Sequence, residues 1–161
     1  MFQKIKKFCK ENLDFIIACV TCYCIVHTFF AGYSVSSHSM DPTLHNGEIG
    51  ISSKLIYTPE YEDIVIVKGK SGDSNELWVK RVIGMPGDTL YCKNNTIYRN
   101  GKPLKETYLG AGTVTEDFSE TTLGNDEYFV MGDNRQHSAD SRIFGTFHKN
   151  EIVAEWLFGL F

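Results

Sequence analysis

An uncharged apolar run near the N-terminus, from Phe15 to Gly32, constrains the fold of this chain more than any other feature. Its 18 residues, FIIACVTCYCIVHTFFAG, are just long enough to span a bilayer as one helix. Lysines precede the run and an acidic excess follows it, so the positive-inside rule places the N-terminus in the cytoplasm. The sequence thus predicts a cytoplasmic N-terminus over 1–14, a transmembrane anchor over 15–32 and an extracytoplasmic domain over 33–161.

A cleaved signal peptide has the same layout of basic residues followed by an apolar run, so it is the alternative to an anchor. Cleavage would require small residues one position and three positions before the cut. The end of the run, Phe29 to Tyr33, reads FFAGY and supplies no suitable pair. An uncleaved anchor that crosses the plasma membrane once is therefore favoured, with the domain that follows it on the outer face.

Charge and cysteine content exclude several partners and cofactors. The chain has 16 basic and 20 acidic residues, and because four lysines stand before the apolar run, the remainder is more acidic than the whole. Such a body is poorly suited to bind a phosphate backbone, so nucleic acid is not expected as a partner. Only Cys92 lies beyond the run, and the histidines lack paired ligand spacing, so no disulfide framework, metal or other cofactor is expected.

The sequence after the run is rich in strand signals and poor in helix signals. Short stretches of β-branched and aromatic residues alternate with Gly, Pro, Asn and Asp, which predicts a mainly β body. Asn100 and Gly101 are a strong hairpin-turn signal. Strands at this spacing are typical of a sandwich or of a closed sheet, and we expect a closed, barrel-like antiparallel β-sheet. The expected strands are Ile49–Tyr57, Asp63–Gly69, Leu77–Gly84, Asp88–Cys92, Asn95–Arg99 and Glu127–Asp133.

Two other segments of the body differ from these strands in composition. Glu106 to Thr122 is polar and contains glycine, and it is interpreted as a surface loop with scope for movement. The apolar C-terminal stretch from Ile152 to Phe161 fits either a final core strand or a patch resting on the membrane. A core strand whose tip reaches the membrane interface is favoured.

Three segments carry residues suited to chemistry: Ser36–Leu44, Val79–Asp88 and Gly132–Gly145. Each has a plain explanation when taken singly. A serine-rich stretch is usually a turn, a lysine on a strand is usually solvated, and a Gly-Asp-Asn-Arg run is usually a turn with a hydrogen-bonded aspartate. Their joint occurrence, in this order behind one apolar run, is the informative observation.

Together these segments resemble the type I signal peptidases, in the short form of Gram-positive bacteria. The family pattern Ser-x-Ser-Met-x-Pro-Thr-Leu is matched at Ser37–Leu44, and Lys-Arg-x-x-Gly-x-Pro-Gly-Asp at Lys80–Asp88. The pattern Gly-Asp-Asn-Arg-x-x-Ser-x-Asp-Ser-Arg is matched at Gly132–Arg142. The resemblance implies a membrane-anchored serine endopeptidase that removes signal peptides from exported precursors after small residues (Ala-x-Ala). Its implied partners are those precursors and membrane lipid, and the oligomeric state is left open.

The resemblance implies that Ser39 is the nucleophile and Lys80 the general base. A serine hydroxyl is inert at neutral pH unless a partner takes its proton. Lysine can do so only when neutral, so its pKa must fall by several units, which burial in an apolar setting achieves. The strand around the lysine offers such a setting through its neighbours Trp78, Val79, Val82 and Ile83.

The resemblance also assigns supporting roles. Ser37 corresponds to the hydroxyl that helps the Ser39 N–H to form the oxyanion hole, and Ser138 to the serine that orients the lysine. A plain turn hydroxyl is the alternative for Ser138. The positions where the family lines its pockets for small side chains are Tyr33, Val35, Met40 and Val79. A supporting charge network, structural rather than catalytic, is expected from Arg81, Asp133, Asp140 and Arg142.

Three rival interpretations share parts of this pattern. A self-cleaving repressor-type Ser-Lys protease has the same pair, but it carries a DNA-binding domain in place of a membrane span. An inactive relative that assists assembly of surface structures would not need Ser39, Lys80 and Ser138 intact. A purely structural anchored β-domain would have no reason to place these residues in such motifs.

Overall fold

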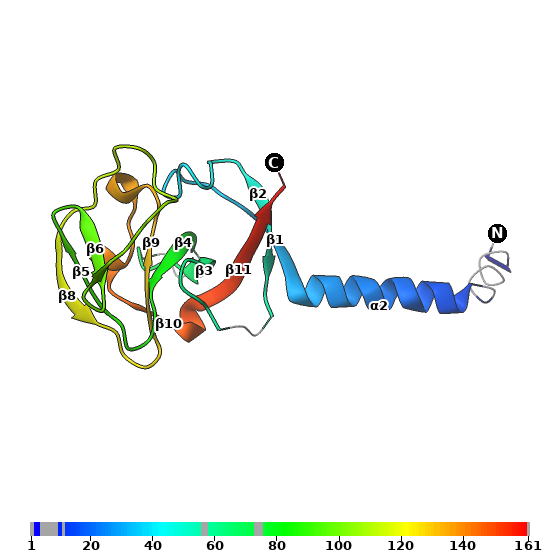
Figure 1. Ribbon diagram of the computed structural model, residues 1–161. Coiled ribbons are helices and arrows are strands. Elements are labelled where there is room, and N and C mark those ends of the chain that lie inside the picture. Colours follow the sequence, from blue (N-terminus) through cyan, green and yellow to red (C-terminus); the bar gives the residue numbers. More distant parts are fainter. Residues whose placement is uncertain (1, 4–9, 11, 56–57, 73–75, 161) are drawn as a thin grey trace.

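The computed structural model describes residues 2–3, 10, 12–55, 58–72 and 76–160. Most of the predicted cytoplasmic segment 1–14, the end of the first predicted strand and Phe161 lie outside these residues. Helix α2 (Leu13–Phe29) projects from one end of a body built of strands (Figure 1). A smaller sheet, which includes strands β5, β6 and β8, lies at the opposite end of this body (Figure 1).

Helix α2 differs from the spanning helix predicted over 15–32. It has 17 residues, none of them buried, and among the described residues no helix is long and apolar enough to cross a membrane. The last predicted residues, from Phe30 to Gly32, belong to β1 (Phe30–Ser34) because their backbone pairs with β2 (Ile49–Ser53). The predicted bounds of the spanning helix are therefore wrong.

The larger sheet has seven antiparallel strands in the order β1-β2-β11-β3-β4-β9-β10. This confirms the mainly β prediction, and strand β4 has the predicted bounds. The C-terminal stretch forms the expected strand, β11, whose tip is exposed at Leu157 and Phe158. The strands of this sheet after β2 are β3 (Ile64–Lys68), β4 (Leu77–Gly84), β9 (Glu127–Met131), β10 (Phe147–His148) and β11 (Ile152–Gly159).

The smaller sheet has four strands in the order β7-β6-β5-β8. Asn100 and Gly101 connect β6 to β7 with φ angles of 52° and 74°, which confirms the predicted hairpin turn. Strand β8 lies inside the segment predicted as a surface loop, so that prediction is wrong for its last five residues. The strands are β5 (Thr89–Lys93), β6 (Thr96–Arg99), β7 (Lys102–Pro103) and β8 (Phe118–Thr122).

Neither sheet closes on itself, so the predicted closed barrel is wrong. Strands β1 and β10 are the edges of the larger sheet, and β7 and β8 are the edges of the smaller one. Closing a sheet requires its two edge strands to pair along a staggered register. Strand β10 has only two residues and is already paired with β9, so it offers too little backbone for closure.

Three clusters of buried apolar side chains form the core. Alternation along β3 separates two of them, because Ile66 faces one cluster while Val65 and Val67 face the other. The third cluster joins the two sheets, since Ile83 of β4 packs there with Leu90 of β5. Three short helices complete the described chain: η1 (Arg135–His137), α3 (Ser141–Phe144) and η2 (Lys149–Glu151).

Candidate active site

Ser39 and Lys80 meet in the interior of the protein. Strand β4, which lies between β3 and β9, carries Lys80, and the turns that follow β1 carry Ser39. Lys80 Nζ lies 2.8 Å from Ser39 Oγ, and the exposed fractions of the two residues are 4% and 7%. The hydroxyl and the amine are therefore within direct proton-transfer distance.

Burial changes the acid–base chemistry of Lys80. Desolvation lowers the pKa of its amine from 10.5 to about 8, although the charges of Asp140 and Glu76 oppose this shift. Among the described residues, Nζ bonds to Ser39 and no carboxylate forms an ion pair with it. A substantial fraction of this lysine is consequently neutral at mildly alkaline pH.

Ser37 lies directly beside Ser39. Its Oγ is 3.1 Å from Ser39 Oγ, and the Ser39 N–H donates to it over 3.4 Å. The Ser37 hydroxyl and the Ser39 N–H are thus adjacent, as two donors to one developing oxyanion must be.

Ser138 approaches the site from the segment that follows β9. Its Oγ is buried and, within the described part of the chain, forms no hydrogen bond of normal geometry. The pKa of the nearby Asp140 carboxyl is low despite its burial, because Arg142 pairs with it and the Ser138 hydroxyl adds to the effect. The expected contact between Ser138 and Lys80 is not among the described hydrogen bonds, so the role of Ser138 stays a prediction.

Gly132 brings this segment against the backbone of Ser39. A Cβ atom at position 132 would collide with the Ser39 carbonyl oxygen and with the Ser138 side chain, so a glycine is required by close approach. The Asn134 N–H donates to the Ser39 carbonyl at 3.0 Å, and Asn134 Nδ2 donates to the His38 carbonyl at 2.9 Å. These contacts fix the turn that contains His38 and Ser39 to the segment that follows β9.

Comparisons with known proteins identify the family of this chain. The family described as "Signal peptidase, peptidase S26" matches residues 9–161. The chain belongs to this signal peptidase family. It is 41% identical to a signal peptidase I of Bacillus amyloliquefaciens, over 91% of this chain and 84% of the relative. It is 34% identical to signal peptidase IB of Staphylococcus aureus, over 91% of this chain and 87% of that one.

A solved structure agrees with the sequence comparison. The crystal structure of a signal peptidase I from Enterococcus faecalis matches with a TM-score of 0.53 and 31% sequence identity. The match covers 62% of this chain and 97% of the other. The predicted family is therefore confirmed, and with it the activity class: a peptidase that processes signal peptides of secreted precursors.

In this signal peptidase family member, a hollow of about 110 Å³ opens beside the serine–lysine pair. Three of the four predicted pocket residues, Val35, Met40 and Val79, line it. Val35 and Met40 are buried, while serines, Glu76 and Lys80 make much of the remaining lining polar. The fourth, Tyr33, is half-buried against the same apolar cluster but does not line this hollow.

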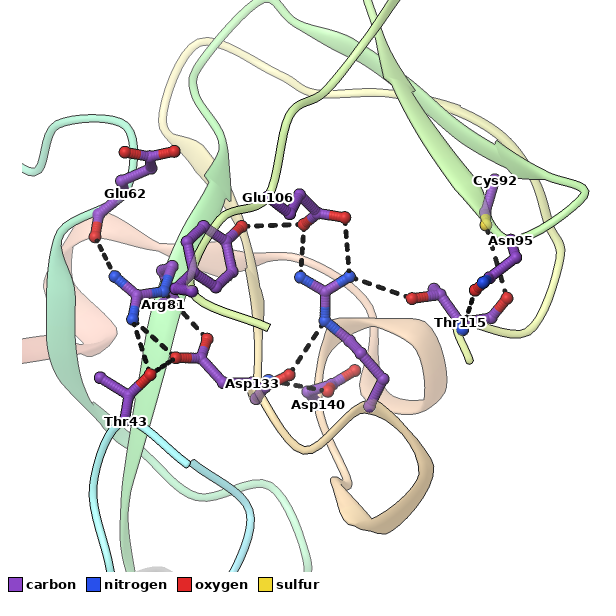
Figure 2. A network of polar contacts seen from close by, with 12 residues as sticks. Thr43, Glu62, Arg81, Cys92, Asn95, Glu106, Thr115, Asp133 and Asp140 are labelled. Atoms are coloured by element: carbon purple, nitrogen blue, oxygen red, sulfur yellow. Dashed lines mark hydrogen bonds and ion pairs between the residues drawn. The ribbon is translucent and has the colours of Figure 1, made fainter. Parts of the chain in front are cut away.

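The four charged residues predicted as a network form two separate ion pairs. Arg81 Nε and Nη2 donate to the two carboxylate oxygens of Asp133 at 2.9 and 2.6 Å (Figure 2). Arg142 Nε and Nη2 donate to the two oxygens of Asp140, both at 2.8 Å. Both carboxylates are fully buried, and Asp140 also accepts from the Gly132 N–H at 3.0 Å. The pairs therefore support the two ends of the segment that packs on Ser39.

A third buried ion pair was missed by sequence reasoning. Arg135 and Glu106 pair across the molecule, although Glu106 stands in the stretch interpreted as a surface loop (Figure 2). Arg135 lies within a matched motif, which gave a weak signal. A single glutamate in a polar stretch gives none.

Among the described residues, no group of three or more His, Cys, Asp or Glu side chains is arranged to hold a metal. The nearest such cluster in sequence, His38, Asp41 and His45, forms internal hydrogen bonds of 2.9 and 3.0 Å on the turn around Ser39. These bonds brace the turn.

Proposed function

We propose that this chain is a membrane-attached serine endopeptidase that uses Ser39 and Lys80 to remove signal peptides from exported precursors after small residues. The observation that carries the proposal is the 2.8 Å contact between the Lys80 amine and the Ser39 hydroxyl. Burial lowers the pKa of this amine to about 8, so it can exist in the neutral form that accepts a proton. A serine nucleophile needs such a base beside it.

In the proposed acylation step, neutral Lys80 accepts the Ser39 proton while Ser39 Oγ forms a bond to the carbonyl carbon of the scissile peptide. The resulting ammonium then gives this proton to the nitrogen of the leaving peptide, whose bond to the carbonyl carbon breaks. Water, deprotonated by the same amine, next attacks the carbonyl carbon of the acyl-Ser39 ester. The ammonium then gives its proton to Ser39 Oγ as the ester bond breaks, which releases the signal peptide. Each half-reaction returns Lys80 to its neutral form.

The oxyanion that develops on the substrate carbonyl accepts hydrogen bonds from the Ser39 N–H and the Ser37 hydroxyl in this proposal. Their adjacency supports it, and the Ser39 N–H, which donates to Ser37 Oγ over 3.4 Å, would exchange this long contact for the oxyanion. The buried Ser138 hydroxyl, which lacks a normal hydrogen bond in the described structure, is proposed to orient the Lys80 amine once substrate is bound.

The proposed substrate binds as an extended segment along strand β1. Strand β1 is an edge of the larger sheet, so one side of its backbone can pair with an added strand. The small hollow lined in part by Val35, Met40 and Val79 would then receive the side chains that precede the cut. A hollow of this size rejects large side chains by steric overlap, which favours Ala-x-Ala.

Membrane attachment is proposed to occur through α2. Its apolar side chains are exposed along the whole helix, for example Phe15 at 70% and Val20 at 55%, and none is buried against the body. Such a surface is stable where lipid covers it. The basic residues before α2 favour a cytoplasmic N-terminus, with the catalytic body on the outer face of the plasma membrane.

The test is cleavage of a precursor with an Ala-x-Ala site by the purified full chain in detergent micelles. We expect cleavage at that site by the wild type and by Ser119→Ala, which changes an exposed serine on β8. Ser39→Ala should retain the melting temperature of the wild type and lose cleavage. A folded Ser39→Ala protein that still cuts the precursor would refute the proposed nucleophile.

A further inference from the structure

Glu106 lies in the connection between β7 and β8 and forms a buried ion pair with Arg135 (Figure 2). Arg135 is 2% exposed, the Glu106 side chain is 9% exposed, and two guanidinium nitrogens donate to the two carboxylate oxygens. The pair joins the smaller sheet to the segment after β9. It holds the two at a fixed separation, because parting them would leave an unpaired charge in the interior.

Arg135 also holds the backbone on which the nucleophile rests. Its Nε donates to the Gly132 carbonyl at 3.1 Å, and Gly132 fits against Ser39 with no room for a Cβ atom. Two residues further on, the Asn134 N–H donates to the Ser39 carbonyl. A displacement of Arg135 would therefore move the atoms that contact Ser39.

Two neighbours fix the ion pair itself. Tyr108 donates its hydroxyl to Glu106 Oε1 at 2.8 Å, while Thr115 Oγ1 accepts from Arg135 Nη1 at 3.1 Å. Burial and the Glu106 charge raise the pKa of Tyr108, so its hydroxyl remains a donor. The Tyr108 ring centre lies 4.0 Å from the Arg81 guanidinium, so Tyr108 connects the Glu106–Arg135 ion pair to the buried pair of Arg81 and Asp133.

We propose that Glu106, acting through Arg135, is a positioning residue that sets the place of the Ser39 hydroxyl relative to Lys80. This inference rests on the proposed function and gives a role to the connection formed by residues 104–117. Among the described contacts, Glu106 bonds to neither Ser39 nor Lys80, so it acts on their geometry. Loss of the ion pair lowers kcat. KM and the midpoint of the pH profile stay unchanged, because the hollow and the burial of Lys80 are preserved.

The test compares Glu106→Gln with the wild type in steady-state cleavage of an Ala-x-Ala peptide by the full chain in micelles. Glutamine keeps the size and one acceptor oxygen but removes the charge. We expect kcat to fall about tenfold or more, since small displacements of reacting groups have effects of that size. KM should stay within about twofold of the wild type.

The matched control is Arg99→Lys, which disturbs another ion pair of the smaller sheet, between Arg99 and Asp88. This pair is not bonded to the segment after β9, so the control should lower the melting temperature and leave kcat unchanged. Unchanged kcat in Glu106→Gln would overturn the proposal. An equal fall of kcat in Arg99→Lys, at the same loss of melting temperature, would also overturn it.

A second variant decides the matter if Glu106→Gln does not fold. Thr115→Val preserves shape and removes one acceptor of Arg135, so reduced kcat supports the positioning role and wild-type kcat contradicts it. Ser39→Ala in the same assay separates this inference from the proposed function. An active Ser39→Ala protein refutes the dyad. Wild-type kcat in the Glu106 variant beside an inactive Ser39→Ala protein refutes the positioning role alone.

Discussion

The two sides of strand β4 bury adjacent cations in different ways. Lys80 contacts a neutral hydroxyl, and desolvation lowers its pKa to about 8. Arg81, which points to the opposite side of the strand, binds the Asp133 carboxylate, and this partner raises its pKa although burial opposes the rise. The exposed fractions are 4% and 7%, so burial is nearly equal. Arg81 has a carboxylate partner and a guanidinium that stays charged at any workable pH, whereas Lys80, in the described part of the chain, has neither.

The difference separates structural cations from the proposed catalytic one. Arg135 behaves as Arg81 does. Burial opposes its charge, but the Glu106 carboxylate raises the pKa of its guanidinium. Both guanidinium groups hold loops in place. Among these three described cations, Lys80 alone has no carboxylate partner, which leaves its amine free to lose a proton near physiological pH.

Lys80→Arg should have the largest effect on activity. An arginine keeps the positive charge but stays protonated at any workable pH, so it cannot accept the Ser39 proton. We expect cleavage to fall about a thousandfold or more, within the range for loss of a general base. Cleavage of the precursor by the folded variant is the measurement. A rate near that of the wild type would mean that Lys80 acts only through its charge.

Asp133→Asn should have the largest effect on stability. It leaves the buried Arg81 guanidinium without its carboxylate partner, which costs about 3 to 5 kcal/mol of unfolding free energy. Denaturant unfolding of the full chain measures this change. Asp126→Asn, on an exposed turn, is the matched control and should change stability by less than about 0.5 kcal/mol. If both variants were equally stable, the Asp133 carboxylate would not be needed to stabilise the buried Arg81 guanidinium.

Glu76→Gln should have the smallest effect. The Glu76 charge favours the ammonium form of Lys80, so removing it lowers the pKa of Lys80 further. The rise of activity with pH should move to lower pH by a fraction of a unit. Glu120→Gln, an exposed change on β8, should leave the profile in place. A shift to higher pH in Glu76→Gln would contradict the electrostatic account.

Local features of the fold were predictable from the sequence, and closure was not. The β-branched and aromatic residues of β4 and the Asn100-Gly101 turn are local signals, and both elements were predicted correctly. Whether β1 meets β10 depends on the lengths of strands more than a hundred residues apart. The end of α2 was misplaced for a similar reason, because backbone pairing with β2 overrides the apolar composition of Phe30–Gly32.

The candidate site shows the same difference between features set by nearby residues and features set by distant ones. Ser39 and Lys80 were proposed from motifs a few residues long, and the structure brings their side chains together across 41 positions of the chain. No motif indicated a role for Glu106, because that role depends on its ion pair with Arg135, which is 29 positions away. The catalytic roles themselves stay predictions until they are measured.

The pH dependence of kcat/KM for the wild-type full chain is the most direct measurement of the central claim, since it reports the protonation state of the free enzyme. If neutral Lys80 is the base, activity is low where the amine is protonated and rises with pH. The midpoint should lie near 8, where burial places the pKa of Lys80. Below it, activity should fall about tenfold per pH unit. A midpoint near the ordinary lysine value of 10.5, or activity that falls as pH rises through 8, would contradict the account.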